Sequence, residues 1–357
     1  PAIGSIAPIT KTFGDATFNL TAPTTNSTGA FSYASSDSNV VSIIGTTVTI
    51  VGAGTATITA SQAGDANYDP RSVTTTITVN KAVATLSAMT AVTKNFGDAS
   101  FNLVVPTSAA TGAITFASSN TNVATINGNT ISIIGAGTVT ITATQATDSN
   151  YLEATTSTTL TVNKIAPSLG SMTAINKTFG DANFTITPPS TNSTGAFAYT
   201  SSDTNVATIT GDLVSIVGAG TATISVDQAT DSNYLAAATS VSLAVNKAPV
   251  VFGTTTAITK NYGDADFILT PPQTNSTGAF TYSSNNPSIA TINGNLVTIQ
   301  GIGTTTITVN QATTTNYLSG STTISLVVNK TLPAIGSIAP ITKTFGDATF
   351  NLTAPTT

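Results

Sequence analysis

Apolar and polar residues alternate along most of this chain with a period of two, which is the pattern of half-buried β-strands. Within residues 1–83 the alternation predicts strands around residues 9–11, 18–22, 31–33, 41–43, 48–50, 55–61 and 73–79. Turn-forming Gly, Asn, Asp and Ser residues separate these segments. The pattern therefore predicts an all-β protein made of short strands.

The alternation belongs to a sequence repeat with a period of 83 residues. An aromatic residue followed by Gly-Asp recurs at this spacing without slipping by a single residue. The five copies of this motif begin at Phe13, Phe96, Phe179, Tyr262 and Phe345. A Gly-x-Gly motif and an Asn-Lys pair keep the same spacing in the four complete copies. A fixed period of this kind predicts tandem copies of one structural unit.

About seven short strands in each copy predict a Greek-key β-sandwich of immunoglobulin type. Because the Asn-Lys pair closes each copy, we divide the chain after each such lysine. The predicted repeats span residues 1–81, 82–164, 165–247 and 248–330, and residues 331–357 begin a fifth, incomplete repeat. Linkers between the repeats are nearly absent. Short connections restrict rotation between neighbours, so the sandwiches are expected to be arranged as a rod.

The chain ends with a copy of its own beginning. Residues 333–357 are identical to residues 1–25, although the intervening copies differ from both at many positions. We therefore expect a longer parent protein in which a four-repeat block recurs. Two strands cannot bury a sandwich core, so this tail needs a covering partner. The sequence favours the rest of a fifth repeat, because repeat 1 already has its own opening strands; the alternative is strand addition to a neighbouring chain.

Composition removes several classes of function. The chain contains no Cys, His or Trp, and charged residues are only 7% of it, while apolar residues reach 40% and argue against disorder. No basic cluster could hold a nucleic-acid backbone. No apolar run approaches the length of a membrane span. We therefore expect neither nucleic acid as a partner nor a membrane span in this segment.

Two stretches that recur in every complete copy carry a family resemblance. The third copy reads Ser201-Ser-Asp-Thr-Asn-Val-Ala207 and then Gly218-Ala-Gly-Thr-Ala-Thr-Ile224, while the second copy has Asn120 in place of the Asp and the fourth departs at Ser283-Ser284-Asn285. This pattern resembles the bacterial Ig-like tandem repeats of giant extracellular surface adhesins. The resemblance covers nearly the whole chain and implies the sandwich fold and an extracellular, bacterial cell-surface location. It implies no catalytic residues and no particular ligand.

No catalytic constellation can be assembled from these residues. The common nucleophile–base pairs need His or Cys. The Gly-x-Gly motifs lie between two strands, so they lack the strand-to-helix context of a dinucleotide site and indicate tight turns instead. We expect no enzyme activity, no cofactor, and no catalytic, cofactor-binding or metal-binding residues.

Calcium is the strongest metal candidate, at a loop that begins like an EF-hand. Asp65, Asn67 and Asp69 place oxygen atoms at alternate positions. The later copies lose this pattern, because the third position becomes Leu152, Leu235 or Leu318. We expect these Asp and Asn side chains to cap a turn, and the tyrosine that follows them to cover the end of the core.

A lysine recurs beside the aromatic-Gly-Asp turn, at Lys11, Lys94, Lys177, Lys260 and Lys343. A Lys–Asn isopeptide crosslink would need a buried acid next to the lysine, and the sequence offers no buried Glu. We therefore expect solvated lysines on an edge strand, where they discourage pairing with another sheet.

A uniform surface rich in Thr and Ser favours a spacer over a specific receptor. We expect a structural stalk or filament shaft of a very long bacterial cell-surface repeat protein, an adhesin, that holds a distal adhesive region away from the cell. The expected partners are neighbouring repeats of the same chain. Lateral self-association into a fibre stays open, and the distal ligand is unknown. The alternatives are a glycan-binding Ig-like module and a phage fibre or decoration protein.

Overall fold

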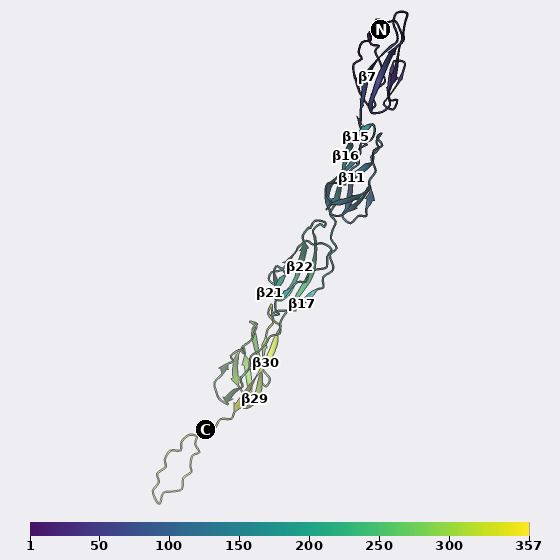
Figure 1. The fold of residues 1–357 in the computed structure, drawn as a ribbon. Coiled ribbons are helices and arrows are strands. Elements are labelled where there is room, and N and C mark those ends of the chain that lie inside the picture. Colours follow the sequence, from purple (N-terminus) through teal and green to yellow (C-terminus); the bar gives the residue numbers. More distant parts are fainter. Residues whose placement is uncertain (357) are drawn as a thin grey trace. The chain divides into compact units, whose positions relative to one another are not determined.

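A computed structural model describes residues 1–356 of the chain. These residues form strands connected by turns and loops (Figure 1). Within this described part, no helix is long and apolar enough to cross a membrane. The prediction of an all-β protein is confirmed.

The first repeat folds into two sheets. One sheet has the strand order β1-β7-β6-β3, and the other has the order β2-β5-β4. Strand β1 pairs in parallel with β7, and the remaining neighbours pair antiparallel. Its strands are β1 (Ile9–Thr12), β2 (Phe18–Asn19), β3 (Phe31–Ser35), β4 (Val41–Ile44), β5 (Thr47–Ile50), β6 (Gly54–Gln62) and β7 (Arg71–Asn80).

The order in which the chain visits the two sheets is that of an immunoglobulin-like sandwich. It passes from the first sheet to the second at β2, back at β3, across again for the β4–β5 hairpin, and returns for the long β6–β7 hairpin. Seven strands in two sheets agree with the number predicted from the alternation. The chain is therefore a tandem array of Ig-like β-sandwiches.

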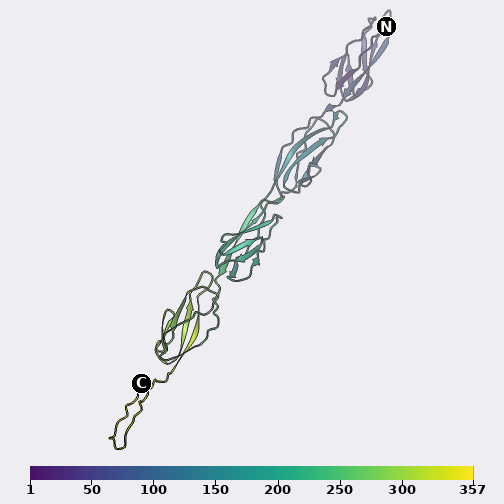
Figure 2. The same cartoon turned by 90° about the vertical axis from the view of Figure 1, so that its left-hand side faces the viewer.

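The later copies repeat this topology (Figures 1 and 2). Repeat 2 adds one short parallel pair, between β8 and β15. Its strands are β8 (Ala82–Val83), β9 (Val92–Asn95), β10 (Phe101–Asn102), β11 (Ile114–Ser118), β12 (Ala124–Asn127), β13 (Thr130–Ile133), β14 (Gly137–Gln145), β15 (Tyr151–Leu152) and β16 (Ala154–Asn163). Those of repeat 3 are β17 (Ile175–Thr178), β18 (Phe184–Thr185), β19 (Phe197–Ser201), β20 (Ala207–Thr210), β21 (Leu213–Ile216), β22 (Gly220–Gln228) and β23 (Ala237–Asn246). Those of repeat 4 are β24 (Ile258–Asn261), β25 (Phe267–Ile268), β26 (Phe280–Ser284), β27 (Ala290–Asn293), β28 (Leu296–Ile299), β29 (Gly303–Gln311) and β30 (Gly320–Asn329).

Each copy has its own hydrophobic core between its two sheets. In repeat 1, Ile58 on β6 and Ile77 on β7 are fully buried together with Val41 and Val48 of the opposite sheet. The threonines that alternate with Ile58 and Ile77 on these strands are more exposed. Aliphatic β-branched side chains suit this pleated surface, since they pack well against cross-strand neighbours.

The alternation places the phenylalanine at the start of the second strand of each copy on the inward side, yet this ring is only partly buried. Phe18, Phe101, Phe184 and Phe267 pack against the cores of their repeats but lie at the margin. The reason is their position on β2 and its equivalents, which are two-residue strands at the edge of the smaller sheet. The fully buried positions belong instead to the long central strands.

A buried glutamine ends the central strand of each repeat, and the alternation pattern did not predict it. Gln62 is 1% exposed, and its Nε2 donates to the carbonyl oxygens of Ser27 and Gly29 at 3.2 and 2.9 Å. Gln145 and Gln311 make the same bonds to the equivalent loops of repeats 2 and 4. Since buried polar groups need partners, this amide ties the loop before β3 to β6.

Glycine closes the β4–β5 hairpin in every copy. Ile44 pairs with Thr47, which leaves a two-residue loop whose first residue, Gly45, has a φ of 62°. A two-residue hairpin loop needs such a left-handed residue, and only glycine adopts it without a steric cost. The equivalent hairpins of repeats 2, 3 and 4 place Gly128, Gly211 and Gly294 there.

By internal contacts, the chain divides into two compact units. The first contains Pro1–Pro167 with Ser193–Gly195 and Thr230–Ala236, and the second contains Ser168–Asn192, Ala196–Ala229 and the residues from Ala237 onward. The loop Thr230–Ala236 of repeat 3 thus groups with repeat 2. The four repeat boundaries drawn from the sequence stay a prediction, and residue 357 lies outside the described part.

We predict that Ile141→Ala destabilises repeat 2 by about 2–5 kcal/mol, because Ile141 is fully buried on β14 and its truncation leaves a cavity. Phe101→Ala should cost less than Ile141→Ala, since Phe101 lies at the margin of the same core. Chemical denaturation of the full chain, monitored by hydrogen exchange of the amides in repeat 2, measures both losses of stability. An equal or larger loss for Phe101→Ala would place that ring inside the core.

Candidate functional site

The described residues, 1–356, contain no cluster of three or more His, Cys, Asp or Glu side chains that could hold a metal ion. The recurrent features that remain are a groove on the side of repeats 2, 3 and 4 and the contacts at the ends of the repeats.

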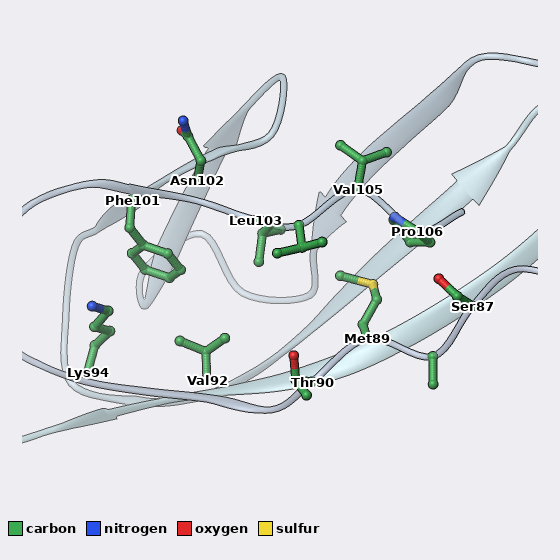
Figure 3. Close-up of a pocket in the computed structure, with 12 residues that line it drawn as sticks. Ser87, Met89, Thr90, Val92, Lys94, Phe101, Asn102, Leu103, Val105 and Pro106 are labelled. Atoms are coloured by element: carbon green, nitrogen blue, oxygen red, sulfur yellow. The ribbon is translucent and has the colours of Figure 1, made fainter. Parts of the chain in front are cut away.

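The groove lies at the edge of the sandwich, between the segment leading into β9 and the segment around β10 (Figure 3). In repeat 2 it encloses about 320 Å³, and Met89, Val92, Phe101 and Leu103 line it with apolar surface. Related grooves in repeats 3 and 4 enclose about 560 and 410 Å³. Lining side chains such as Met89 and Val92 pack against the hydrophobic core, so the groove is a gap between two unpaired strand edges.

The recurrent lysine stands at one end of this groove. Lys94 Nζ lies 5.0 Å from the centroid of the Phe101 ring, and Figure 3 shows the side chain pointing toward that ring. The other copies repeat the contact at 4.8 or 4.9 Å, with Lys11 on Phe18, Lys177 on Phe184, Lys260 on Phe267 and Lys343 on Phe350. An ammonium over an aromatic face is a cation–π pair.

The prediction for this lysine is therefore half right. It lies on an edge strand, as expected, but in the four complete repeats it is half-buried against a ring and not simply solvated. The lysine covers the otherwise open margin of the core with its aliphatic stem.

A second recurrent feature is the loop between the two longest strands, which we call the tip loop. The tip loops span residues 63–70, 146–153, 229–236 and 312–319. Asp148 organises the tip loop of repeat 2, because its Oδ1 accepts from the backbone N–H groups of Asn150 and Tyr151 at 2.8 and 2.7 Å. Its Oδ2 accepts from the backbone N–H and the hydroxyl of Thr111 at 2.7 and 3.0 Å.

These bonds explain the acidic residue that resembled a calcium ligand. Hydrogen bonds to the carboxylate, first among them the one from the Thr111 backbone N–H, lower the pKa of Asp148 to about 2. Asp65 and Asp231 are held in the same way, and the pKa of each is lowered. Both carboxylate oxygens of these residues are occupied in capping the loop.

The asparagine of the tip loop reaches the preceding repeat. Asn150 Oδ1 accepts a hydrogen bond at 2.9 Å from the backbone N–H of Ala53, which lies between the two glycines of the Gly-x-Gly turn in repeat 1. A Cβ on Gly52 would lie 2.5 Å from the Asn39 carbonyl oxygen and 3.2 Å from Asn150 Oδ1, so only glycine fits. The same bond recurs from Ala136 to Asn233 at 2.9 Å and from Ala219 to Asn316 at 2.8 Å.

The tyrosine next to it packs on an aromatic ring of the preceding repeat. The rings of Tyr151 and Phe13 meet edge to face, with centroids 5.3 Å apart and planes at 83°. The pairs Phe96–Tyr234 and Phe179–Tyr317 repeat this geometry at 5.5 Å and 81°. Edge-to-face packing is a favoured arrangement of aromatic rings.

The lysine that closes each repeat completes the contact. Lys81 Nζ donates to the Asp148 carbonyl oxygen at 2.5 Å and to Thr147 Oγ1 at 3.3 Å, and Ala82 N donates to the Asn150 carbonyl oxygen at 3.0 Å. Lys164 and Lys247 bond the Asp231 and Thr314 carbonyl oxygens at 2.5 and 2.6 Å. At each of these positions the ammonium donates to one carbonyl oxygen and one threonine hydroxyl.

We call this set of contacts the joint, and the surface that receives the tip loop the end face. The joint consists of the hydrogen bond between the Gly-x-Gly turn and the Asn side chain, the Tyr–Phe ring pair and the contacts of the closing lysine. Sequence reasoning assigned the asparagine to turn capping and the tyrosine to the end of its own core. Both were wrong in repeats 2, 3 and 4, because these side chains contact the repeat before. The available signal was the recurrence of Asn-Tyr at the same spacing as the Gly-x-Gly motif.

Comparison with known proteins adds one family match. A family model described as "Intimin, immunoglobulin-like domain" matches residues 273–313, which lie in repeat 4. No curated protein matches the chain.

The similar solved structures include Drosophila N-cadherin EC1-4, with 10% identity, 92% of this chain and 99% of that chain covered, and a TM-score of 0.28. Sidekick-1 immunoglobulin domains 1–5 align at 12% identity over 92% of this chain and 81% of that chain, with a TM-score of 0.32. The titin I-band fragment I67–I69 aligns at 16% identity over 70% of this chain and 99% of that chain, with a TM-score of 0.31. Scores this low carry no argument about function.

We predict that the aromatic pair of the first joint couples repeats 1 and 2 energetically. A double-mutant cycle with Phe13→Leu and Tyr151→Leu should give an interaction energy of about 0.5–1.5 kcal/mol, measured by denaturation of the full chain. The matched control is the cycle of Phe13→Leu with Tyr234→Leu, whose ring packs on Phe96 instead. Additive single effects in the Phe13–Tyr151 cycle would show that the rings do not hold the joint.

We predict that the Asp148 cap is lost in acid. A carboxylate whose pKa is lowered on folding stabilises the native state above its unfolded pKa, near 3.8, and loses that effect as pH falls through about 2. The melting temperature of the wild type should therefore exceed that of Asp148→Asn at pH 7, and the gap should close between about pH 4 and pH 2. Thr314→Ala is the control, because Thr314 caps the tip loop of repeat 4 without an ionisable group. A gap for Asp148→Asn that is equally wide at pH 7 and pH 2 would contradict the assignment.

Proposed function

We propose that this chain forms part of the structural stalk or filament shaft of a very long bacterial cell-surface repeat protein, of the adhesin type. In this role the repeats are spacers that hold a distal adhesive region away from the cell. The observation that carries the proposal is the joint, because one set of contacts recurs with nearly constant geometry between consecutive repeats.

The chemistry of the joint suits a spacer. Three kinds of contact hold each tip loop on the preceding repeat: a hydrogen bond from a crowded glycine turn to the Asn side chain, a ring pair, and an ammonium on a carbonyl oxygen and a threonine hydroxyl. Together they restrict both bending and twisting of the short linker. The ammonium is covalently part of the chain, so the joint needs no dissociable cation to bring these oxygen atoms together. A stalk built this way keeps its stiffness when metal concentrations fall.

The fold and the family match support the location and the non-enzymatic role. Adhesion-type Ig-like domains are generally not enzymes, and the match of residues 273–313 to an intimin Ig-like domain supports a place on a bacterial surface. The low charge of the chain, with 7% charged residues, also favours a surface whose solubility does not depend on salt.

The glycan-binding alternative gains no support from the groove. Sugars usually stack on exposed aromatic rings, whereas the face of Phe101 is covered by the Lys94 ammonium. The sides of the groove are also formed by residues that serve the core.

We predict that the chain behaves as an elongated, semi-rigid particle with a maximum dimension on the order of 150 Å, from four sandwiches whose strands rise about 3.3 Å per residue. Small-angle X-ray scattering measures this. The triple variant Asn150→Ala, Asn233→Ala, Asn316→Ala should scatter as a more flexible chain with unchanged repeat stability. Asn102→Ala, on an exposed strand position away from the joints, is the control. A compact wild-type particle would refute the stalk.

A further inference from the structure

Both methionines of the chain lie at the same place in two of the grooves. Met89 lines the groove of repeat 2, and Met172 lines the groove of repeat 3. The counterparts of these residues in repeats 1 and 4 are Ile6 and Thr255, so the sandwich fold does not itself require a methionine here. Methionine is flexible and polarisable, and proteins use it where a surface must adapt to a ligand. The two grooves therefore share a feature that suits binding.

A single charged side chain lines each of these two grooves. It is Lys94 in repeat 2 and Lys177 in repeat 3, and no described Asp or Glu belongs to either lining. Within the described part of the chain, neither ammonium forms an ion pair with a carboxylate. Each contacts a ring face instead, Phe101 at 5.0 Å or Phe184 at 4.8 Å from the centroid. An ammonium has three N–H donors, so a ring on one side leaves donors on the other side for an anion.

The ammonium stands at one end of an apolar groove. Figure 3 shows Lys94 at one end of the groove of repeat 2 and Met89 with Pro106 at the other, while Val92 and Leu103 lie between them. Repeat 3 lines its groove with the counterparts of these residues, which are Lys177, Met172, Pro189, Ile175 and Ile186. Each groove is therefore positively charged at one end and apolar along its length.

The size of the grooves suits one short hydrocarbon chain. Their volumes of about 320 and 560 Å³ lie in the lower half of the range for small-molecule sites, which is about 300–1,000 Å³. A chain that packs on Met89, Val92 and Leu103 removes apolar surface of both partners from water, which is favourable. A carboxylate at the end of that chain accepts charge-assisted hydrogen bonds from the ammonium.

We propose that the grooves of repeats 2 and 3 each bind one medium-chain aliphatic carboxylate in its monomeric form. The carboxylate lies on Lys94 or Lys177, and the chain follows the apolar walls toward the methionine. This goes beyond the stalk, because it gives the sides of these repeats a ligand of their own. The ammonium that covers the ring against a stacked sugar is the group that anchors this ligand.

Repeat 4 provides a contrast within the same chain. Its groove of about 410 Å³ is lined by Thr255 in place of the methionine, and the lining includes neither Lys260 nor Phe267. Lys260 nevertheless lies 4.9 Å from the centroid of the Phe267 ring, as in the other copies. The cation–π pair by itself is therefore not the site, and we expect repeat 4 to bind the carboxylate more weakly than repeats 2 and 3.

The two methionines also supply the measurement. Isotope labelling of the methionine methyl groups in the full chain gives one NMR signal from each groove, and Met172→Leu assigns them. The probes are decanoate below its micelle concentration, decyltrimethylammonium, which has the same chain with the opposite charge, and acetate, which has the carboxylate without the chain. Decanoate should shift both signals until they saturate. The other two probes should shift them at least tenfold less at equal concentration.

Lys94→Gln removes the ammonium from one groove and leaves the other as an internal reference. It should weaken decanoate binding at the Met89 signal at least tenfold, while the Met172 signal responds as in the wild type. Lys260→Gln is the matched control, because it removes the same cation–π pair from repeat 4 and should leave both responses unchanged. The comparison of the three probes needs no variant, so it decides the proposal even if Lys94→Gln destabilises repeat 2.

Several results would overturn the proposal. They are the lack of a saturable shift with decanoate, an equal shift with decyltrimethylammonium or with acetate, and a Lys94→Gln chain that folds and binds decanoate like the wild type. None of these measurements involves the joints, so the stalk keeps its own test.

Discussion

The antiparallel ladder between the two longest strands of each repeat is the interaction on which the rest of the structure depends. In repeat 1 it joins β6 and β7 over nine residue pairs, from Gly54 with Val79 to Gln62 with Arg71. Its inward side chains form half of the core, and β7 offers its free edge to β1. The same two strands carry the tip loop at one end. At the other end they present the Gly-x-Gly turn and the closing lysine. A single hairpin thus supplies the tip loop, the Gly-x-Gly turn and the closing lysine, whereas the ring of the end face, Phe13 in repeat 1, follows β1.

This arrangement explains why the 83-residue period does not slip. A residue inserted in the hairpin would turn the inward side chains outward, and it would also displace the tip loop from the turn that it must reach. Core and joint therefore constrain the same strands.

The joint is built from groups that carry little net charge. Its one recurrent ion is a lysine whose ammonium lies on carbonyl and hydroxyl oxygens, and not on a carboxylate. The acidic residues of the tip loops are used within their own repeat, where the tip loop and Thr111 or its counterparts donate to the carboxylate. Consequently, a surface with few charges still has specific joints, since their geometry comes from an amide, two rings and a crowded glycine.

Alternation and periodicity in the sequence were sufficient to predict the all-β fold, the seven strands and the tandem sandwiches. These features depend on local pattern, because a strand with one buried face needs an apolar residue at every second position. The turn glycines and the capping role of Asp65 were also readable, since both act within a few residues of their own position. The partner of Asn150 was not readable, because Ala53 lies 97 positions away and belongs to another repeat. The shallow position of Phe18 likewise followed from its strand being a short edge strand, which no alternation reveals. Only the tertiary structure decided these contacts, since a repeating sequence states that two motifs share a period but not which copies of them touch.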